Sequence, residues 1–109
     1  MIRHSVLFSF KPTASKEACE ALLREYVDFP RIHKKMRNFT LGRNISQRDQ
    51  TFEYAFNVDF DDEQDLKDYL NSREHEEHVV ERFRPLVSVR AIVSYEVARG
   101  EVTNLFDRT

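Results

Sequence analysis

The sequence predicts a single α+β domain in which antiparallel strands pack against helices. Two stretches, residues 2–10 and 52–60, alternate between apolar and polar side chains, which is the period of a strand with one buried face. Between them, residues 19–27 place apolar side chains at the i, i+3, i+4, i+7 spacing of a core-facing helix. A chain of 109 residues fits one domain and is too short for two independent cores.

The first half of the chain predicts a strand, a helix and a second strand. The apolar face of the first strand includes a histidine among hydrophobic side chains: Ile2, His4, Val6, Phe8 and Phe10. The helix is expected from Ser15 to Phe29, because Ser15 can cap its first turn and Pro30 cannot continue it. Residues 36–43 alternate again and predict the second strand.

The second half predicts a strand, a helix broken in two and a last strand. Residues 52–60 give the third strand a nearly all-aromatic face, and Asp62 can cap the helix that follows. Ser72 interrupts this helix and can cap a second short one, which is expected to run through Arg82 and to be closed by Arg84-Pro85. Residues 88–97 alternate and predict the fourth strand.

The element order is therefore β-α-β-β-α-β, which is the pattern of a ferredoxin-like fold with a four-stranded antiparallel sheet and helices on one face. The other face of the sheet is expected to mix small polar and apolar side chains: Ser5, Leu7, Thr40, Ala55, Asn57, Ile92 and Ser94. Such a face suits neither a dry core nor open solvent, so we predict a homodimer that packs sheet to sheet.

Composition excludes several classes of protein. The formal charge of −2, with basic and acidic residues interspersed, offers no stripe for nucleic acid. The two glycines, Gly42 and Gly100, cannot build a phosphate-binding loop or a dinucleotide fingerprint. No apolar run has the length of a membrane-spanning helix, and the one cysteine fits a reducing compartment, so we expect a cytoplasmic protein without a membrane partner.

The candidate site centres on His75. In a regular α-helix His75 shares a face with Val79 and Phe83, whereas His78 lies over charged neighbours and is expected to point to solvent. This divergence makes a His75–His78 metal pair a minor alternative, so no metal is predicted. His33, in a basic connector, is expected to be a solvated loop residue.

An inward imidazole needs a polar partner, and the predicted topology offers four on the same side of the sheet: His4, Tyr26, Tyr54 and Tyr69. Imidazole suits proton transfer near neutral pH, and a phenol can stabilise a developing enolate oxygen. We therefore expect proton abstraction next to a carbonyl group of a small-molecule ligand. A satisfied core histidine remains the alternative for each imidazole.

The chain resembles the stress-responsive dimeric α/β-barrel (Dabb) family over residues 2–97. The resemblance is carried by five segments: Arg3-His4, Phe39-Thr40-Leu41-Gly42-Arg43-Asn44, Asp68-Tyr69-Leu70 with the following His75, Arg82-Phe83-Arg84-Pro85-Leu86-Val87, and Ser94-Tyr95-Glu96-Val97. The family includes plant polyketide cyclases that close a linear thioester by intramolecular aldol condensation without a cofactor. The resemblance implies a dimeric α/β barrel and a reaction without a cofactor. It also implies three catalytic residues: His75 as general base, Tyr69 as its hydrogen-bonding partner and His4 as the active-site histidine of the first strand.

The resemblance also implies which residues line the cavity: Val6, Phe8, Leu22, Leu23, Tyr26, Val27, Phe39 and Phe56. Tyr54, Val79 and Phe83 join this set by their predicted positions. The cyclase-type members have a histidine on the third strand where this chain has Tyr54, and the large Phe8, Phe39 and Phe56 favour a small, polar carbonyl compound over a long alkyl chain.

Three functions follow for the domain, residues 1–97. The first is a cofactor-independent lyase, isomerase or cyclase; the second is a non-catalytic stress-response or ligand-binding homo-oligomer; the third is a cofactorless oxygenase of the wider group. The C-terminal tail, residues 98–109, is expected to pack on the partner subunit through Val102, Leu105 and Phe106.

Overall fold

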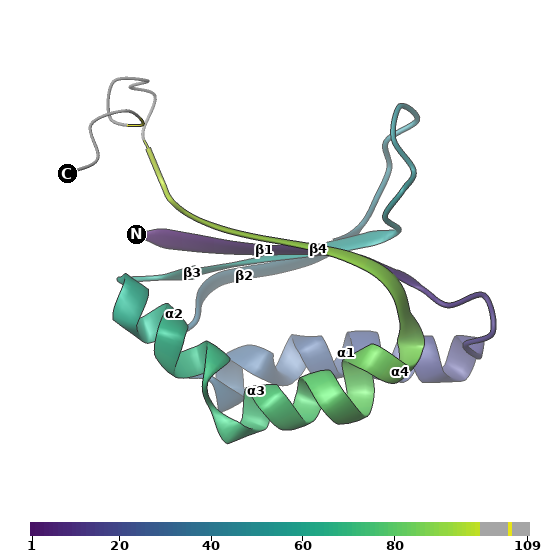
Figure 1. The fold of residues 1–109 in the computed structure, drawn as a ribbon, viewed down its shortest axis with the longest axis horizontal. Coiled ribbons are helices and arrows are strands. Elements are labelled where there is room, and N and C mark those ends of the chain that lie inside the picture. Colours follow the sequence, from purple (N-terminus) through teal and green to yellow (C-terminus); the bar gives the residue numbers. More distant parts are fainter. Residues whose placement is uncertain (99–104, 106–109) are drawn as a thin grey trace.

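The computed structural model describes residues 1–98 and 105. It contains four strands, a long helix and a broken helical segment, in this order: β1 Ile2–Phe10, α1 Lys16–Ile32, β2 Arg37–Arg43, β3 Tyr54–Phe60, α2 Glu63–Leu70, α3 Arg73–His78, the π-helix η1 Val79–Phe83, α4 Arg84–Leu86 and β4 Val87–Glu96. Figure 1 shows the helices together on one face of the sheet, so that the molecule has two layers.

The four strands form one antiparallel sheet in the order β2-β3-β1-β4. The apolar faces of β1 and β3 point toward the helices, because His4 pairs with Val58 and Val6 with Phe56, and all four side chains are buried. The predicted ferredoxin-like fold is confirmed. The core lies between these two central strands and α1.

The structure corrects the predicted faces of β4. Ser94 pairs with His4 and Ile92 with Val6, so both lie on the helical side and not on the outer face where we expected them. The alternation of β4 alone could not decide this, because both of its faces carry apolar residues. Only the pairing register with β1 sets which set points outward.

The helix α1 corrects the predicted boundary at Pro30. The helix continues through Pro30 to Ile32, and the backbone N–H of His33 donates to the carbonyl of Phe29 at its C-terminal end. Pro30 is exposed and lies in the last turn, where the helix loses only the one hydrogen bond that proline cannot donate. His33 thereby becomes part of the helix end.

The broken helical segment begins as predicted but ends later. Asp62 caps α2 through Asp65 N–H, and Ser72 caps α3 through His75 N–H. Beyond His78 the backbone widens into the π-helix η1, in which Arg84 N–H donates to the carbonyl of Val79, five residues back. Pro85 lies in the first turn of α4 and does not close the segment at Arg84.

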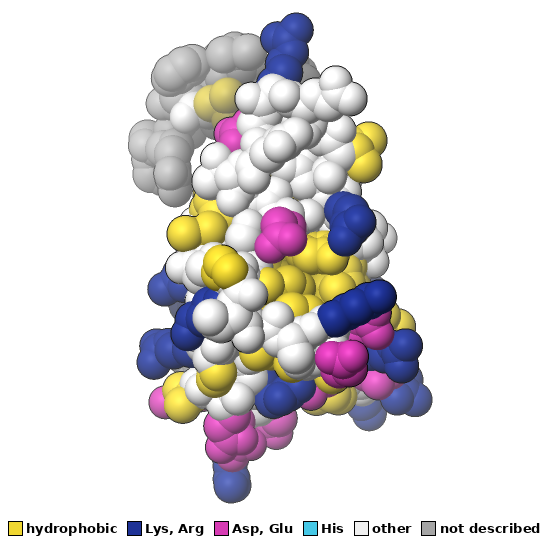
Figure 2. Space-filling view, turned by 90° about the vertical axis from the view of Figure 1, so that its right-hand side faces the viewer, with side chains coloured by type: hydrophobic (Ala, Val, Ile, Leu, Met, Phe, Trp, Pro, Cys, Tyr) yellow, Lys and Arg dark blue, Asp and Glu magenta, His cyan; other side chains and the backbone are white. Residues whose placement is uncertain are grey.

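The outer face of the sheet carries exposed apolar side chains that no helix covers, chiefly Val89, Val93 and Tyr95 of β4. The loop between β2 and β3 projects from this face, away from the helices (Figure 1). In the side view of Figure 2, charged side chains concentrate over the helical layer, while the projecting part is mostly uncharged.

Among the described helices, none is long and apolar enough to span a membrane. The tail residues Val102 and Phe106 lie outside the described residues.

Candidate functional site

Tyr69 is the centre of the candidate site. Its side chain, on α2, is only 5% exposed and packs against Phe60 at 5.5 Å between ring centroids. Two imidazoles contact the tyrosine ring edge-on, His75 at 4.6 Å and His33 at 4.8 Å, and the His4 ring lies 6.2 Å away. Three elements besides α2 thus direct an imidazole toward one buried phenol.

Ser72 fixes the geometry between Tyr69 and His75. Its hydroxyl donates to the carbonyl of Tyr69 at 2.7 Å and accepts the backbone N–H of His75 at 3.2 Å. One side chain therefore ends α2 and begins α3. The two rings meet because the break between the helices is hydrogen-bonded on both sides.

A second imidazole–phenol pair lies beside the first. His78 Nε2 is 3.0 Å from the hydroxyl of Tyr26, and the His78 ring also packs against Phe29 at 4.8 Å. Our prediction that His78 points to solvent is therefore wrong. The error lay in the assignment of faces, because His78 is three residues after His75 in the regular helix α3, and residues at i and i+3 share a face.

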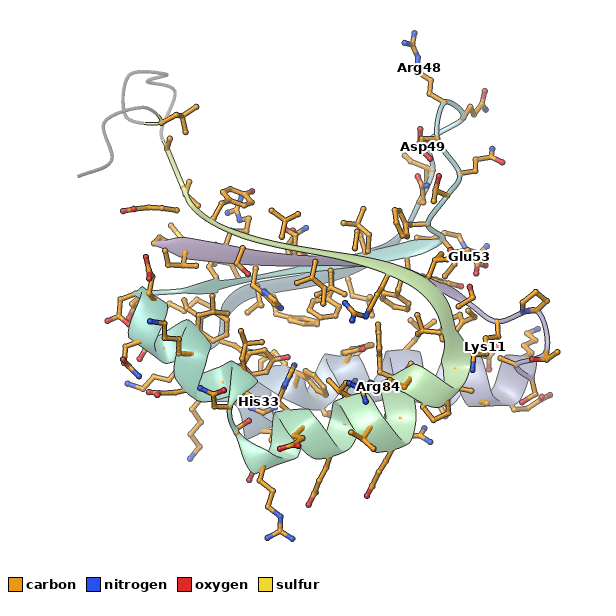
Figure 3. All side chains as sticks on the ribbon, viewed as in Figure 1. Lys11, His33, Arg48, Asp49, Glu53 and Arg84 are labelled. Carbon is orange, nitrogen blue, oxygen red and sulfur yellow. The ribbon has the colours of Figure 1, made fainter. Side chains whose placement is uncertain are left out.

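His33 also lies inward, which corrects its assignment as a solvated loop residue. It is half-buried, and Figure 3 shows it on the helical side of the sheet. The buried side of α1 is formed by Leu22, Tyr26 and Phe29, and His33 extends this stripe by one further turn. The stripe could have found His33 from the sequence, had the helix not been ended at Pro30.

The sequence analysis also missed Ser94. Its hydroxyl oxygen lies 2.8 Å from Nδ1 of His4, and the His4 side chain is 2% exposed. This hydrogen bond engages Nδ1 and leaves Nε2 free of it. Ser94 was missed because we had placed it on the opposite face of the sheet.

Burial keeps the four imidazoles neutral at physiological pH. Burial, together with a smaller contribution from His75, lowers the pKa of His4 and of His78 to about 4. Burial likewise lowers the pKa of His75, opposed by the backbone of Leu70, and the pKa of His33, opposed by Glu74. Burial raises the pKa of Tyr26 and Tyr69, so both phenols stay protonated.

The other predicted site residues divide by location. Most lie in the core between sheet and helices, either fully buried or packed against it: Val6, Phe8, Leu22, Leu23, Phe39, Phe56 and Phe83. Val79 is half-buried, whereas Val27 is 68% exposed on the solvent side of α1 and does not join the group. The buried stripe of α1 consists of Leu22, Tyr26 and Phe29, and Val27 lies outside this stripe.

Tyr54 does not converge with Tyr69, contrary to our prediction. It stacks on Phe8 at 5.8 Å, and its hydroxyl accepts a hydrogen bond from Arg43 at 3.2 Å. Phe8 lies four residues along β1 from His4, roughly 13 Å at the rise of a strand. Tyr54 therefore belongs to the end of the sheet that carries the β2–β3 loop.

Two surface hollows lie on the outer face and not at the histidines. The larger, about 520 Å³, is bounded by β2, β3 and their loop, with Leu7, Gly42 and Asn57 among its lining residues. The smaller, about 350 Å³, is lined by polar groups that include Arg3 and Tyr95. Within residues 1–98 and 105, no three His, Cys, Asp or Glu side chains are grouped in a way that could hold a metal ion.

The arrangement supplies proton acceptors and hydrogen-bond donors in one nonpolar layer. A neutral imidazole can take a proton, and a protonated phenol can donate to an oxygen that gains negative charge. Half-burial of His33, His75 and His78 leaves each imidazole an edge toward solvent, whereas Tyr26 and Tyr69 are almost fully enclosed. Acid–base chemistry on a small molecule is what these groups can perform.

The fold and this cluster define a ferredoxin-like α+β domain with an acid–base layer between sheet and helices. The family model described as Stress responsive A/B Barrel Domain matches residues 2–97. The chain therefore belongs to this family. Curated protein sequences contain no match to the chain.

Solved structures share the fold at low sequence identity. A protein from Arabidopsis thaliana is 21% identical with a TM-score of 0.82, covering 94% of this chain and 100% of its own. The hydroxynitrile lyase of Passiflora edulis is 19% identical with a TM-score of 0.83, covering 92% and 95%. A dimeric ferredoxin-like protein of unknown function from Thermobifida fusca is 20% identical with a TM-score of 0.74, covering 88% and 90%.

Proposed function

We propose that this protein is a cofactor-independent lyase, isomerase or cyclase that acts on a small carbonyl or hydroxy compound. His75 is the general base, Tyr69 donates a hydrogen bond to the substrate oxygen, and His4 completes the site. The observation that carries this proposal is the enclosure of the buried Tyr69 phenol by neutral imidazoles, with the His75 ring at 4.6 Å. One hydrogen-bond partner is enough to satisfy a buried polar group, so three imidazoles around one phenol are more than a core requires.

Among the three reaction classes we favour a lyase. The Passiflora edulis relative is a hydroxynitrile lyase. In such a reaction His75 removes the hydroxyl proton of the substrate, the carbonyl forms as the bond to the cyano carbon breaks, and the imidazolium returns the proton to cyanide. Tyr69 stabilises the oxygen during this step. The stacked Phe39 and Phe56 rings, 5.5 Å apart, favour a small substrate.

The cyclase alternative rests on the sequence. We infer a resemblance to olivetolic acid cyclase, a plant polyketide cyclase, through His4, Tyr69 and His75. An intramolecular aldol condensation begins with the removal of a proton next to a carbonyl, which the same base and phenol would perform. The roles of His75 and Tyr69 are therefore common to C–C cleavage and C–C formation.

The test uses one assay for cleavage and one for proton abstraction. The full chain is assayed for release of aldehyde from mandelonitrile and for α-proton exchange of small ketones and β-keto thioesters in D₂O. For each reaction that the wild type catalyses, we expect His75→Ala to lower the rate by about 10²- to 10⁴-fold. Glu76→Gln, an exposed substitution on α3, is the matched control. An equal rate in the wild type and His75→Ala would overturn the assignment of the base.

A ligand-binding homo-oligomer without catalysis is the second candidate. The observation in its favour is that both hollows lie on the outer face, away from His75. It predicts that a small molecule raises the melting temperature equally in the wild type and His75→Ala. Turnover that depends on His75 contradicts it.

We propose further that the chain forms a homodimer through the outer face of its sheet. The support is the row of exposed Val89, Val93 and Tyr95 on β4, and the dimeric state of the Thermobifida fusca relative. We also propose residues 1–97 as the domain and residues 98–109 as a tail that contacts the partner.

A further inference from the structure

The second imidazole–phenol pair has no role in the mechanism proposed above. Tyr26, on α1, is 1% exposed and His78 Nε2 lies 3.0 Å from its hydroxyl, which makes this pair more directly bonded than Tyr69 and His75. The Tyr26 ring packs against Phe56 at 4.9 Å, and Phe56 in turn lies 6.5 Å from His4. The pair therefore borders the same nonpolar layer as the first.

The two pairs also interact electrostatically. Besides burial, which is the larger cause in each case, Tyr69 raises the pKa of Tyr26 and His75 lowers the pKa of His78. Arg82 and His33 contribute in the same direction at His78. When His75 accepts a proton, His78 is thus held neutral and keeps its hydrogen bond to Tyr26 instead of competing as a second base.

We propose that His78 is a positioning residue: its imidazole fixes the Tyr26 hydroxyl as a second hydrogen-bond donor to the substrate oxygen, beside Tyr69. This inference rests on the proposed function and deepens it. With Nε2–H of His78 donating to the phenol oxygen, the Tyr26 proton is left to point at the substrate. Two donors at one oxygen suit a charge that develops only in the transition state.

A purely structural role makes a different prediction. If His78 only satisfied the buried Tyr26 hydroxyl, its loss would lower stability, but the folded protein would turn over substrate at the usual rate. A positioning role lowers kcat while KM changes little, because the oxygen gains its charge after binding. The two roles are therefore separated by steady-state kinetics on folded protein.

The experiment compares His78→Leu, His78→Gln and the control Val80→Ala in the full chain. Val80 lies in η1 and is 49% exposed, so its change tests the segment without touching the pair. With the mandelonitrile or exchange assay, we expect His78→Leu to lower kcat about tenfold, and His78→Gln to recover most of this because its amide can still bond the phenol.

The decisive variant is the double mutant. Because His78 acts through Tyr26, His78→Leu should have no further effect on kcat in the Tyr26→Phe background. In protein labelled with ¹³Cζ-tyrosine, His78→Leu should shift the Tyr26 resonance and leave Tyr69 unchanged. An unaltered kcat in folded His78→Leu, or equal effects in both backgrounds, would overturn the inference. Absence of turnover in the wild type would instead overturn the proposed function, and this inference with it.

Discussion

Burial of polar side chains is costly, and this chain has all four of its histidines in or beside its core. Their neighbours reduce the cost: His4 has the hydroxyl of Ser94, His78 has that of Tyr26, His75 has the backbone of Leu70, and His33 packs on the ring of Tyr69. Since the imidazoles are neutral, no buried charge has to be compensated. The consequence is sensitivity to acid.

The pKa values predict how stability depends on pH. Unfolded histidines titrate near 6.5, whereas His4 and His78 titrate near 4 in the folded chain, so the unfolded state binds more protons between these values. Above pH 6.5 the histidines are neutral in both states and the free energy of unfolding is not reduced. As the pH falls toward 4, the free energy of unfolding decreases by as much as about 3 kcal/mol for each histidine. Urea denaturation between pH 7.5 and 4.5 measures it.

The matched comparison is His78→Phe, which keeps an aromatic ring against Phe29 but cannot titrate. Its free energy of unfolding should fall less steeply with decreasing pH than that of the wild type. Titration of carboxylates such as Asp59, whose pKa is lowered chiefly by Arg3, is common to both proteins and cancels. Parallel pH profiles would show that His78 is not neutralised by burial.

At the scale of elements, the break between α2 and α3 brings the base to the phenol. We predict that Ser72→Ala lowers the free energy of unfolding by about 1 kcal/mol, because the cap of α3 is lost. It should also loosen the approach of His75 to Tyr69 and so reduce the His75-dependent rate by more than the stability loss explains. Chemical denaturation and the exchange assay are the measurements.

The control for Ser72 is Ser15, which caps α1 in the same way through Ala18 N–H at 3.1 Å. Ser15→Ala should cost similar stability and leave the rate unchanged, because Ser15 lies at the other end of α1 from His33. If both alanine variants lower the rate equally, the special role of Ser72 is refuted.

The elements also explain which parts of the site can be predicted from sequence. Strand alternation and the caps Asp62 and Ser72 are local patterns, and they were sufficient for the element order and the inward His75. His33 was missed because Pro30 is tolerated inside α1, and His78 was missed although its position three residues after His75 puts both on one face of α3. The tolerance of Pro30 inside α1 has no sequence signal strong enough to override the regular rule.

Pairing across the sheet is the third source of error. The residues of β4 alternate clearly, but which set faces the helices depends on a register with β1 that joins positions about 90 residues apart, as for His4 and Ser94. A hydrogen bond of this kind is a property of the tertiary structure. It can be found from sequence only if the strand order and one pairing are already known.

The whole molecule has one face that its own helices leave uncovered. A domain of this size buries only about 60–65% of the surface of its unfolded chain, so a partner contributes appreciably to its stability. The apolar part of the outer face lies mainly on β4. Beside it the partly exposed Arg3 holds the buried Asp59 through two hydrogen bonds of 2.8 and 3.1 Å. Sheet-to-sheet packing of a second copy would cover the apolar side chains and the two hollows together.

Val93 provides the test of this dimer. Its side chain is 52% exposed on the outer face, at a position of the edge strand β4 that pairs with Ser5. In sedimentation velocity, the wild type should have twice the chain mass of 13.0 kDa, and Val93→Asp should shift the protein to the monomer, because the charge would be buried without a partner. Val27→Asp, at a 68% exposed position on α1, should remain dimeric. A wild-type monomer, or dissociation by both substitutions alike, would rule out the outer face of the sheet as the interface.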